Sequence, residues 1–198
     1  MKLHTNAASP FARKCRVVAH ALDLKLEEVR TLPMQEPEFR RINPLGKIPA
    51  LILDDGSVLI DSPVICEYLN NAGGGTFFPT ISVWKEDTRR WKILGLHALG
   101  DGLADAAVAW IVEGRQQPVN EASRARHMAA VTATLDVLER AKLADEMTIG
   151  EVAVGCALGY LDFRMPDLDW KSSRPKLAAW YARMCEYTAM KATVPAAP

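Results

Sequence analysis

The N-terminal part of the chain alternates short apolar runs with one amphipathic segment. Lys2 to Asn6 alternates in side-chain character, as a half-buried strand does. From Phe11 to Leu22 apolar residues recur at helical spacing, after Ser9 as a candidate N-cap and Pro10 at the first helical position. Leu26 to Val29 has the pattern of a second strand. Strand, helix and strand in this order predict a right-handed βαβ unit with parallel strands.

The stretch from Asn43 to Leu53 predicts a tight turn that runs directly into a buried strand. It begins with asparagine, proline and glycine, which favour turns, and continues as the apolar run Pro49 to Leu53. The Ile48–Pro49 bond is either an ordinary trans bond at the start of a hairpin or a cis bond, the state of about 5–6% of X-Pro bonds. A cis bond would turn the backbone N–H and C=O of Ile48 outward, where an extended peptide could pair with them.

A further strand and helix follow this turn. Val58 to Ile60 comes after an Asp-Asp-Gly-Ser turn signal, so this strand should pair antiparallel with the preceding one. Ser62 is the expected N-cap of a helix from Val64 to Asn70, which the glycine run at 73–75 ends. The polar segment before Asn43 contains one helical turn, at Glu36–Arg41. The whole describes a small four-stranded α/β layer.

The remainder of the chain reads as helical. A Thr-x-x-Glu capping box at 148–151 predicts a helix start in which the Thr148 hydroxyl accepts from the Glu151 N–H and the carboxylate reaches back. The tail from Thr193 should be loosely held. The expected helices are Val83–Glu113, Asn120–Ala144, Ile149–Phe163, which carries glycine and alanine on its sides, and a last one from Arg174-Pro175 through Glu186.

Composition narrows the class of protein. The 198 residues balance 24 Lys and Arg against 24 Asp and Glu, so no basic excess points to nucleic acid or an anionic membrane. No stretch of about 18 apolar residues suggests a membrane span. Four cysteines are widely spaced without a CxxC pair, and the four histidines are dispersed. We therefore expect reduced, buried thiols, no metal site and a cytoplasmic protein.

Taken together, these residues resemble a glutathione transferase, and the likeness covers essentially the whole chain. The pattern is most similar to bacterial members with a serine-type site. The resemblance implies an α/β plus all-α fold: a thioredoxin-like, glutathione-binding N-terminal domain (1–76), a linker (77–82) and a helical-bundle domain that contributes the electrophile pocket (83–198). The segments that carry it are Ser9-Pro10-Phe11, Asn43 through Leu51, Asp61 through Leu69, the capping box with Gly155 through Arg164, and Arg174 through Trp180.

The resemblance also assigns glutathione-binding roles to five residues. With Pro49 in the cis form, the backbone of Ile48 would pair with the cysteinyl part of glutathione like an added strand. Ser62 and the free N–H groups of its helix would bind the γ-glutamyl carboxylate, and Asp61 would face the γ-glutamyl ammonium. Many relatives carry glutamate in place of Asp61. Lys47 could meet the glycine carboxylate, although an exposed turn lysine is the more frequent outcome.

Ser9 is the candidate catalytic residue. A hydroxyl at a helix N-terminus can hydrogen-bond the glutathione sulfur and favour its thiolate, since a free thiol of pKa ~8.5 is mostly protonated at pH 7. As an N-cap alone, Ser9 would have no catalytic role, and Thr5, Asn6 or Ala8 in the same loop could share the task. Relatives with cysteine before this proline exchange thiols and disulfides. Ser9 cannot do so, and Cys15 lies too far along the helix.

The sequence thus leads to the hypothesis of a cytoplasmic glutathione transferase, a detoxification enzyme. It would conjugate the thiol of reduced glutathione to a small hydrophobic electrophile. One alternative is a glutathione-dependent peroxidase, isomerase or lyase at the same site. Another is a non-catalytic binding or regulatory protein with the transferase fold. We expect a homodimer with these two small molecules as partners, and neither nucleic acid nor a membrane.

Overall fold

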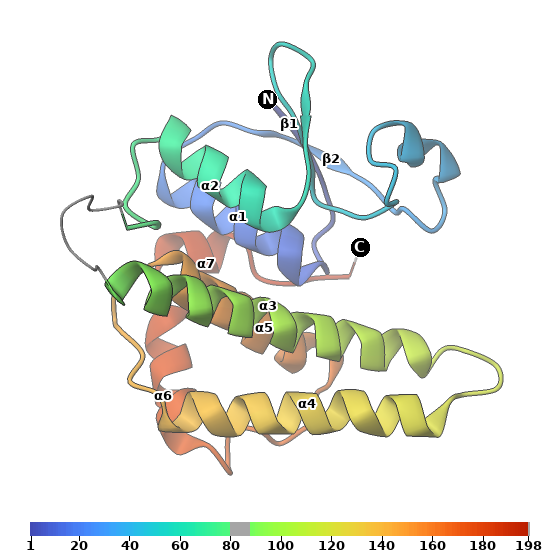
Figure 1. Cartoon of the computed structure of the whole chain (residues 1–198), viewed down its shortest axis with the longest axis vertical. Coiled ribbons are helices and arrows are strands. Elements are labelled where there is room, and N and C mark those ends of the chain that lie inside the picture. Colours follow the sequence, from blue (N-terminus) through green and yellow to red (C-terminus); the bar gives the residue numbers. More distant parts are fainter. Residues whose placement is uncertain (80–87, 198) are drawn as a thin grey trace. The chain divides into compact units, whose positions relative to one another are not determined.

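The computed structural model describes residues 1–79 and 88–197 (Figure 1). The chain divides into two compact units, one made of Met1–Glu86 with Thr188–Pro198 and the other of Asp87–Tyr187. The last eleven residues therefore group with the first unit, whereas the sequence analysis assigned them to the helical domain. The expected start of a helix at Val83 and the second half of the expected linker lie outside the described residues.

The first unit is built around a four-stranded mixed sheet. Its strand order is β2-β1-β3-β4, with β1 parallel to β2 and antiparallel to β3, and β3 antiparallel to β4. This confirms the predicted βαβ unit and hairpin. Its elements are β1 (Lys2–Thr5), α1 (Pro10–Ala21), β2 (Glu27–Arg30), the 3-10 helix η1 (Pro37–Arg41), β3 (Ala50–Ile52), β4 (Val58–Leu59), α2 (Ser62–Ala72) and α7 (Thr188–Ala192).

Helices α1 and α2 lie side by side in this unit (Figure 1). Helix α1 also packs on α7, and α2 on β3. The apolar faces meet in a fully buried core of Leu3, Cys15, Val18, Leu51, Ile65, Cys66 and Leu69. Burial of such side chains contributes about 25 cal/mol per Å² of apolar surface, which makes this core the main support of the loops that it carries.

The tail is held more firmly than expected. Thr193 is buried, and its hydroxyl donates to the Ala189 carbonyl at 2.8 Å. The Ala196 N–H donates to the Ala7 carbonyl at 3.3 Å, and the Arg13 guanidinium donates to the Met190 carbonyl at 3.2 Å. The tail is thus held at Thr193 and at the Ala196 N–H, whereas the side chains of Val194, Ala196 and Ala197 are exposed, so the expectation of a loose tail is correct only in part.

The second unit is helical and is organised around α5. Almost every residue of α5 is buried, and α5 packs along α3, behind it in the view of Figure 1. At Gly100 of α3 an added Cβ would lie 2.7 Å from backbone atoms of Ala153 and Val154, so glycine permits this close approach. The small-sided, central helix is thus confirmed. The helices are α3 (Thr88–Glu113), α4 (Glu121–Arg140), α5 (Ile149–Arg164) and α6 (Pro175–Met184).

The predicted capping box opens α5 with different partners. The Thr148 hydroxyl accepts from the Gly150 N–H at 3.2 Å, one residue earlier than expected, and donates to a carboxylate oxygen of Glu151. The other oxygen of Glu151 accepts from the Ala144 N–H at 3.3 Å. The Glu151 carboxylate thus binds the loop that precedes α5 as well as the cap residue of α5.

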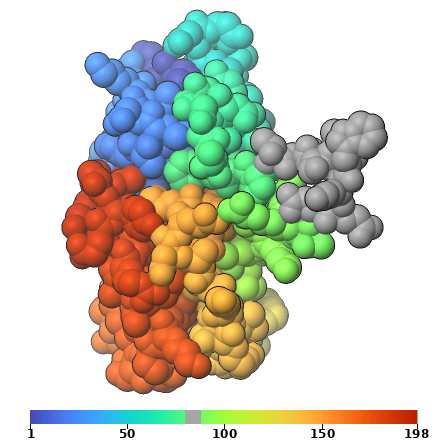
Figure 2. All heavy atoms as spheres, turned by 90° about the vertical axis from the view of Figure 1, so that its left-hand side faces the viewer, coloured from blue at the N-terminus to red at the C-terminus, as the bar shows by residue number. Residues whose placement is uncertain are grey.

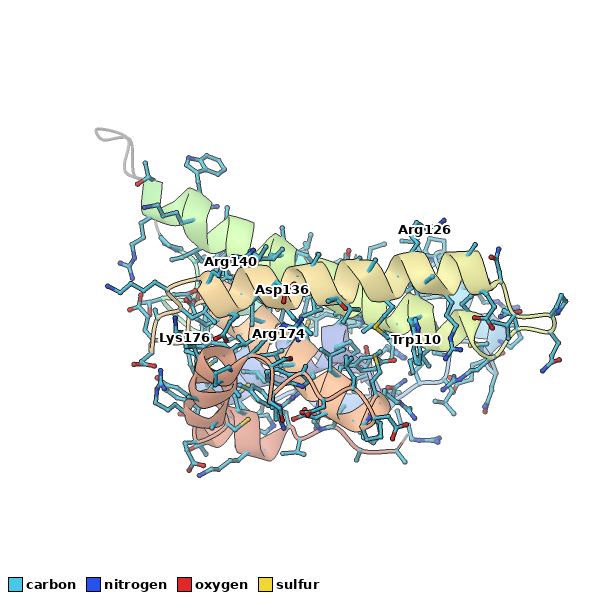
Figure 3. The ribbon with its side chains drawn as sticks, turned by 90° about the horizontal axis from the view of Figure 1, so that it is seen from below. Trp110, Arg126, Asp136, Arg140, Arg174 and Lys176 are labelled. Atoms are coloured by element: carbon cyan, nitrogen blue, oxygen red, sulfur yellow. The ribbon has the colours of Figure 1, made fainter. Side chains whose placement is uncertain are left out.

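Helix α6 has no side-chain cap of its own and is capped by α4. The Glu139 carboxylate accepts from the N–H groups of Lys176 at 3.2 Å and Leu177 at 2.8 Å. One turn away along α4, Asp136 pairs with Arg174 at 2.7 Å. Both residues are labelled in Figure 3. Figure 2 shows α6 beside the C-terminal end of α4. These bonds satisfy N–H groups that a helix start otherwise leaves unpaired.

Among the described helices, none is long and apolar enough to cross a bilayer.

We predict that Glu139→Ala lowers the free energy of unfolding by about 1–2 kcal/mol, because two helix N–H groups lose their acceptor. Denaturant unfolding of the purified protein measures the change. Glu146→Ala is the matched control, since its ion pair with Arg89 is solvent-exposed and such pairs contribute about 0–1 kcal/mol. Equal losses in the two variants would contradict a capping role for Glu139.

Candidate functional site

The loop between β1 and α1 is built around Asn6 and Ser9. The Asn6 side-chain oxygen accepts from the N–H groups of Ala8 at 3.1 Å and Ser9 at 2.9 Å, a turn that asparagine favours. The Ser9 hydroxyl oxygen accepts from the Ala12 N–H at 3.2 Å and so caps α1. Ser9 is half-buried. Because the oxygen acts as acceptor to the helix, its proton remains available for a further acceptor outside the helix.

A buried network ties this loop to the sheet. The Asn6 amide donates to the Thr31 carbonyl at 3.3 Å, and the Thr31 hydroxyl lies 2.9 Å from Nδ1 of His4. Since that hydroxyl donates to the Val29 carbonyl, we assign Nδ1 of His4 as the donor. Burial lowers the pKa of His4, against a smaller opposing effect of the Glu36 carboxylate, so the ring is neutral at pH 7.

Sequence reasoning did not identify His4 or Thr31 as support for this loop. No local signal marks them, because they are far apart along the chain and meet only through the pairing of β1 with β2. The place of Asn6 is better indicated, since asparagine before two small residues is a turn signal. The Asn6 side chain spends its oxygen and one of its two amide N–H groups on the backbone, so its second N–H keeps Asn6 as an alternative donor to a thiolate.

Asn43 holds the turn before β3 from inside. Its side chain is buried, accepts from the Leu45 N–H at 3.0 Å and donates to the Lys47 carbonyl at 2.6 Å. The Gly46 N–H donates to the Asn43 carbonyl at 2.8 Å, and Gly46 has a φ of 60°, a conformation that favours glycine. The predicted turn is thus confirmed. Lys47 itself is exposed, in agreement with the alternative that it is an ordinary turn lysine.

The Ile48–Pro49 peptide bond is cis. Pro49 is buried directly before β3, while Ile48 is half-buried. In residues 1–79 and 88–197 the Ile48 backbone has no hydrogen-bond partner. Ala50 pairs with His4 in the antiparallel register, so the next residue pair outward brings Pro49 opposite Thr5. The turn before β3 and the loop after β1 therefore lie at the same end of the sheet.

The start of α2 differs from the expectation in one respect. Asp61, which follows a cis peptide bond, is the N-cap, and its carboxylate accepts from the Ser62 N–H at 2.5 Å. Ser62 is the first helical residue rather than the cap, because its backbone already lies within the helix. Its hydroxyl is fully buried and has no hydrogen-bond partner among the described residues. A buried, unpaired hydroxyl costs about 1–3 kcal/mol relative to a paired one.

The six candidate residues all lie in the first unit, and they are Ser9, Lys47, Ile48, Pro49, Asp61 and Ser62. Ser9 and Ser62 begin the neighbouring helices α1 and α2, and the two helices meet where the Cys15 thiol lies 3.8 Å from the Ser62 carbonyl oxygen. Helix N-termini and the unpaired Ile48 backbone together offer hydrogen-bond partners to an anionic, peptide-like ligand. No group of three or more His, Cys, Asp or Glu side chains that could hold a metal is found in the part of the chain that the structure describes.

Comparisons with known proteins agree with this geometry. Residues 8–72 match the glutathione S-transferase N-terminal domain, and residues 121–183 match its C-terminal domain. An uncharacterised GST-like protein of Escherichia coli K12, YibF, is 30% identical over 188 residues, which cover 89% of this chain and 90% of that protein.

Two solved structures from Pseudomonas fluorescens Pf-5 are also similar. A glutathione transferase family member with bound glutathione is 38% identical with a TM-score of 0.88, covering 99% of both chains. A second, with bound S-(propanoic acid)-glutathione, is 36% identical with a TM-score of 0.84 and covers 100% of both. The two matched domains and this similarity over the full length show that the chain belongs to the glutathione S-transferase family.

Proposed function

We propose that this transferase conjugates the thiol of reduced glutathione to a small hydrophobic electrophile, with Ser9 as the residue that activates the sulfur. The observation that carries the proposal is the Ser9 hydroxyl, which accepts from the Ala12 N–H and keeps its own proton to donate. The bound S-(propanoic acid)-glutathione of the Pseudomonas fluorescens relative, a glutathione with a carbon group on its sulfur, supports thioether formation as the reaction class.

The chemistry needs only a stabilised thiolate and a positioned electrophile. The Ser9 hydroxyl donates to the glutathione sulfur, and the N-terminus of α1 adds a partial positive charge, so the thiolate is favoured at neutral pH. The thiolate attacks the electrophilic carbon, and either a leaving group departs or a double bond takes up the electron pair. Ser9 is neither nucleophile nor base in this scheme.

Glutathione itself is held by four residues, Ile48, Ser62, Asp61 and Lys47. The unpaired backbone of Ile48, set by the cis Pro49, pairs with the cysteinyl part. The γ-glutamyl carboxylate accepts hydrogen bonds from the Ser62 hydroxyl and the Ser62 N–H. It thereby displaces the Asp61 carboxylate, which accepts from that N–H in the ligand-free chain. Asp61, once displaced, faces the γ-glutamyl ammonium. Lys47 adds a cation at the glycine end.

The proposal includes the setting of the reaction. A homodimer and a cytoplasmic location belong to it, since the cytosol keeps glutathione in its thiol form. Calorimetric titration with reduced glutathione tests binding, and a panel of electrophiles, hydroperoxides and isomerisable substrates then tests the reaction class. Turnover of the electrophiles is the expected outcome. Turnover of hydroperoxides or isomerisable substrates alone would favour the other enzymatic alternatives, and no binding by the folded protein would overturn the site.

We predict that Ser9→Gly lowers turnover and raises the pKa of bound glutathione's thiol by about 1 unit or more, because the sulfur loses its hydrogen-bond donor. Glycine is nearly as good an N-cap as serine, so this variant separates chemistry from helix stability better than Ser9→Ala. Ultraviolet titration of the thiolate measures the pKa, and calorimetry checks that binding is nearly intact. An unchanged pKa and turnover would remove Ser9 from the role.

We predict that Ser62→Ala weakens glutathione binding by about 1–3 kcal/mol, because a charge-assisted hydrogen bond is lost. The same change should leave the free energy of unfolding unchanged or slightly raised, since the ligand-free chain gives this buried hydroxyl no partner. Calorimetric titration and denaturant unfolding give the two quantities. A loss of stability with unchanged affinity would contradict the binding role.

A further inference from the structure

Two cysteines form a buried thiol pair between α1 and α2. The sulfur atoms of Cys15 and Cys66 lie 3.7 Å apart, and both residues are fully buried. The Cys66 thiol donates to the Cys15 sulfur, and the Cys15 thiol donates to the Ser62 carbonyl at 3.8 Å. The other two cysteines, Cys156 and Cys185, belong to the helical unit.

The pair lies directly behind the start of α2. Cys66 follows Ser62 by four residues, so the two occupy the same face of the helix, one turn apart. Cys15 comes from α1, whose first turn Ser9 caps. The sulfurs therefore join the two helices whose N-termini carry Ser9 and the Asp61–Ser62 pair.

We propose that Cys15 and Cys66 are a redox modification site, which a peroxide converts into a reversible intramolecular disulfide. One sulfur attacks the peroxide, breaks its O–O bond and becomes a sulfenic acid, with release of one water from hydrogen peroxide. The second sulfur attacks the first, forms the S–S bond and releases a second water. Two thiols and one peroxide thus give one disulfide and two waters.

The geometry of the pair favours the second step. A disulfide needs the sulfurs about 2.05 Å apart, so they must approach by only about 1.7 Å. A sulfenic acid formed on either residue meets its partner thiol at once, which protects it from further oxidation.

The modification itself does not depend on the proposed function, but its consequence does. Formation of the bond removes the thiol donor to the Ser62 carbonyl and draws α1 and α2 together beneath the anion-binding start of α2. We therefore expect the disulfide form to bind reduced glutathione about tenfold more weakly, because the shift of α2 weakens the hydrogen bond from the Ser62 hydroxyl to the charged γ-glutamyl carboxylate.

Peptide mapping without reduction, after treatment of the folded wild-type chain with hydrogen peroxide, tests the modification. The expected product is one peptide pair joined through Cys15 and Cys66, with two thiols fewer to alkylate after unfolding, and dithiothreitol should restore both. Four remaining thiols, a sulfinic acid at either residue, or a disulfide that includes Cys185 would overturn the proposal. This readout needs no glutathione, so its failure is distinct from failure of the proposed function.

Variants then test the link to the site. In Cys66→Ser the glutathione affinity should no longer respond to peroxide, whereas Cys156→Ser and Cys185→Ser, as matched controls, should respond as the wild type does. If Cys66→Ser does not fold, Cys15→Ser serves the same purpose, and the mapping of the wild type decides the modification by itself. A disulfide form with unchanged glutathione affinity would overturn the coupling.

Discussion

The N–H groups at a helix start must find acceptors, and this requirement shapes the whole chain. Each described solution uses a side chain: Ser9 caps α1, Asp61 caps α2, Thr148 caps α5, and Glu139 caps α6 from another helix. A capping group whose hydrogen bonds are all made within the protein has none left for a ligand. Ser9 differs because its oxygen serves the helix while its proton stays free, so the same atom that stabilises α1 can also stabilise a thiolate.

The sequence predicted those features that local chemistry determines. Ser9 before Pro10 marked the start of α1, and the Asn43 turn marked the start of β3, because capping and turn residues act over a few positions. The βαβ order and the hairpin then gave the sheet. The cis state of Pro49 followed from the family resemblance alone, since residues at the turn left both states open.

The sequence failed where distant residues decide. Residues 141–144 are good helix formers, yet α4 ends at Arg140, because the Ala144 N–H binds Glu151 and the Ala144 carbonyl accepts from Trp180 at 2.8 Å. The identity of the α2 cap was wrong for a related reason. Both Asp61 and Ser62 are good caps, and the backbone conformation of Asp61 selects it.

Ser9 and Ser62 differ in the hydrogen bonds that their hydroxyls make in the ligand-free protein. Ser9 has a structural role in the free protein, because its hydroxyl oxygen caps α1, and the proposed chemistry uses only the remaining proton. The Ser62 hydroxyl is buried without a partner among residues 1–79 and 88–197, which raises the free energy of the ligand-free chain. A ligand that supplies an acceptor for this hydroxyl removes that free-energy penalty. Part of the free energy of binding would thus come from the penalty that the ligand-free protein carries, and not from the new contact alone. The Cys15–Cys66 pair lies one helical turn from the unpaired Ser62 hydroxyl. A small shift of α2 against α1 at this pair would therefore change the hydrogen bond that Ser62 can make to a ligand.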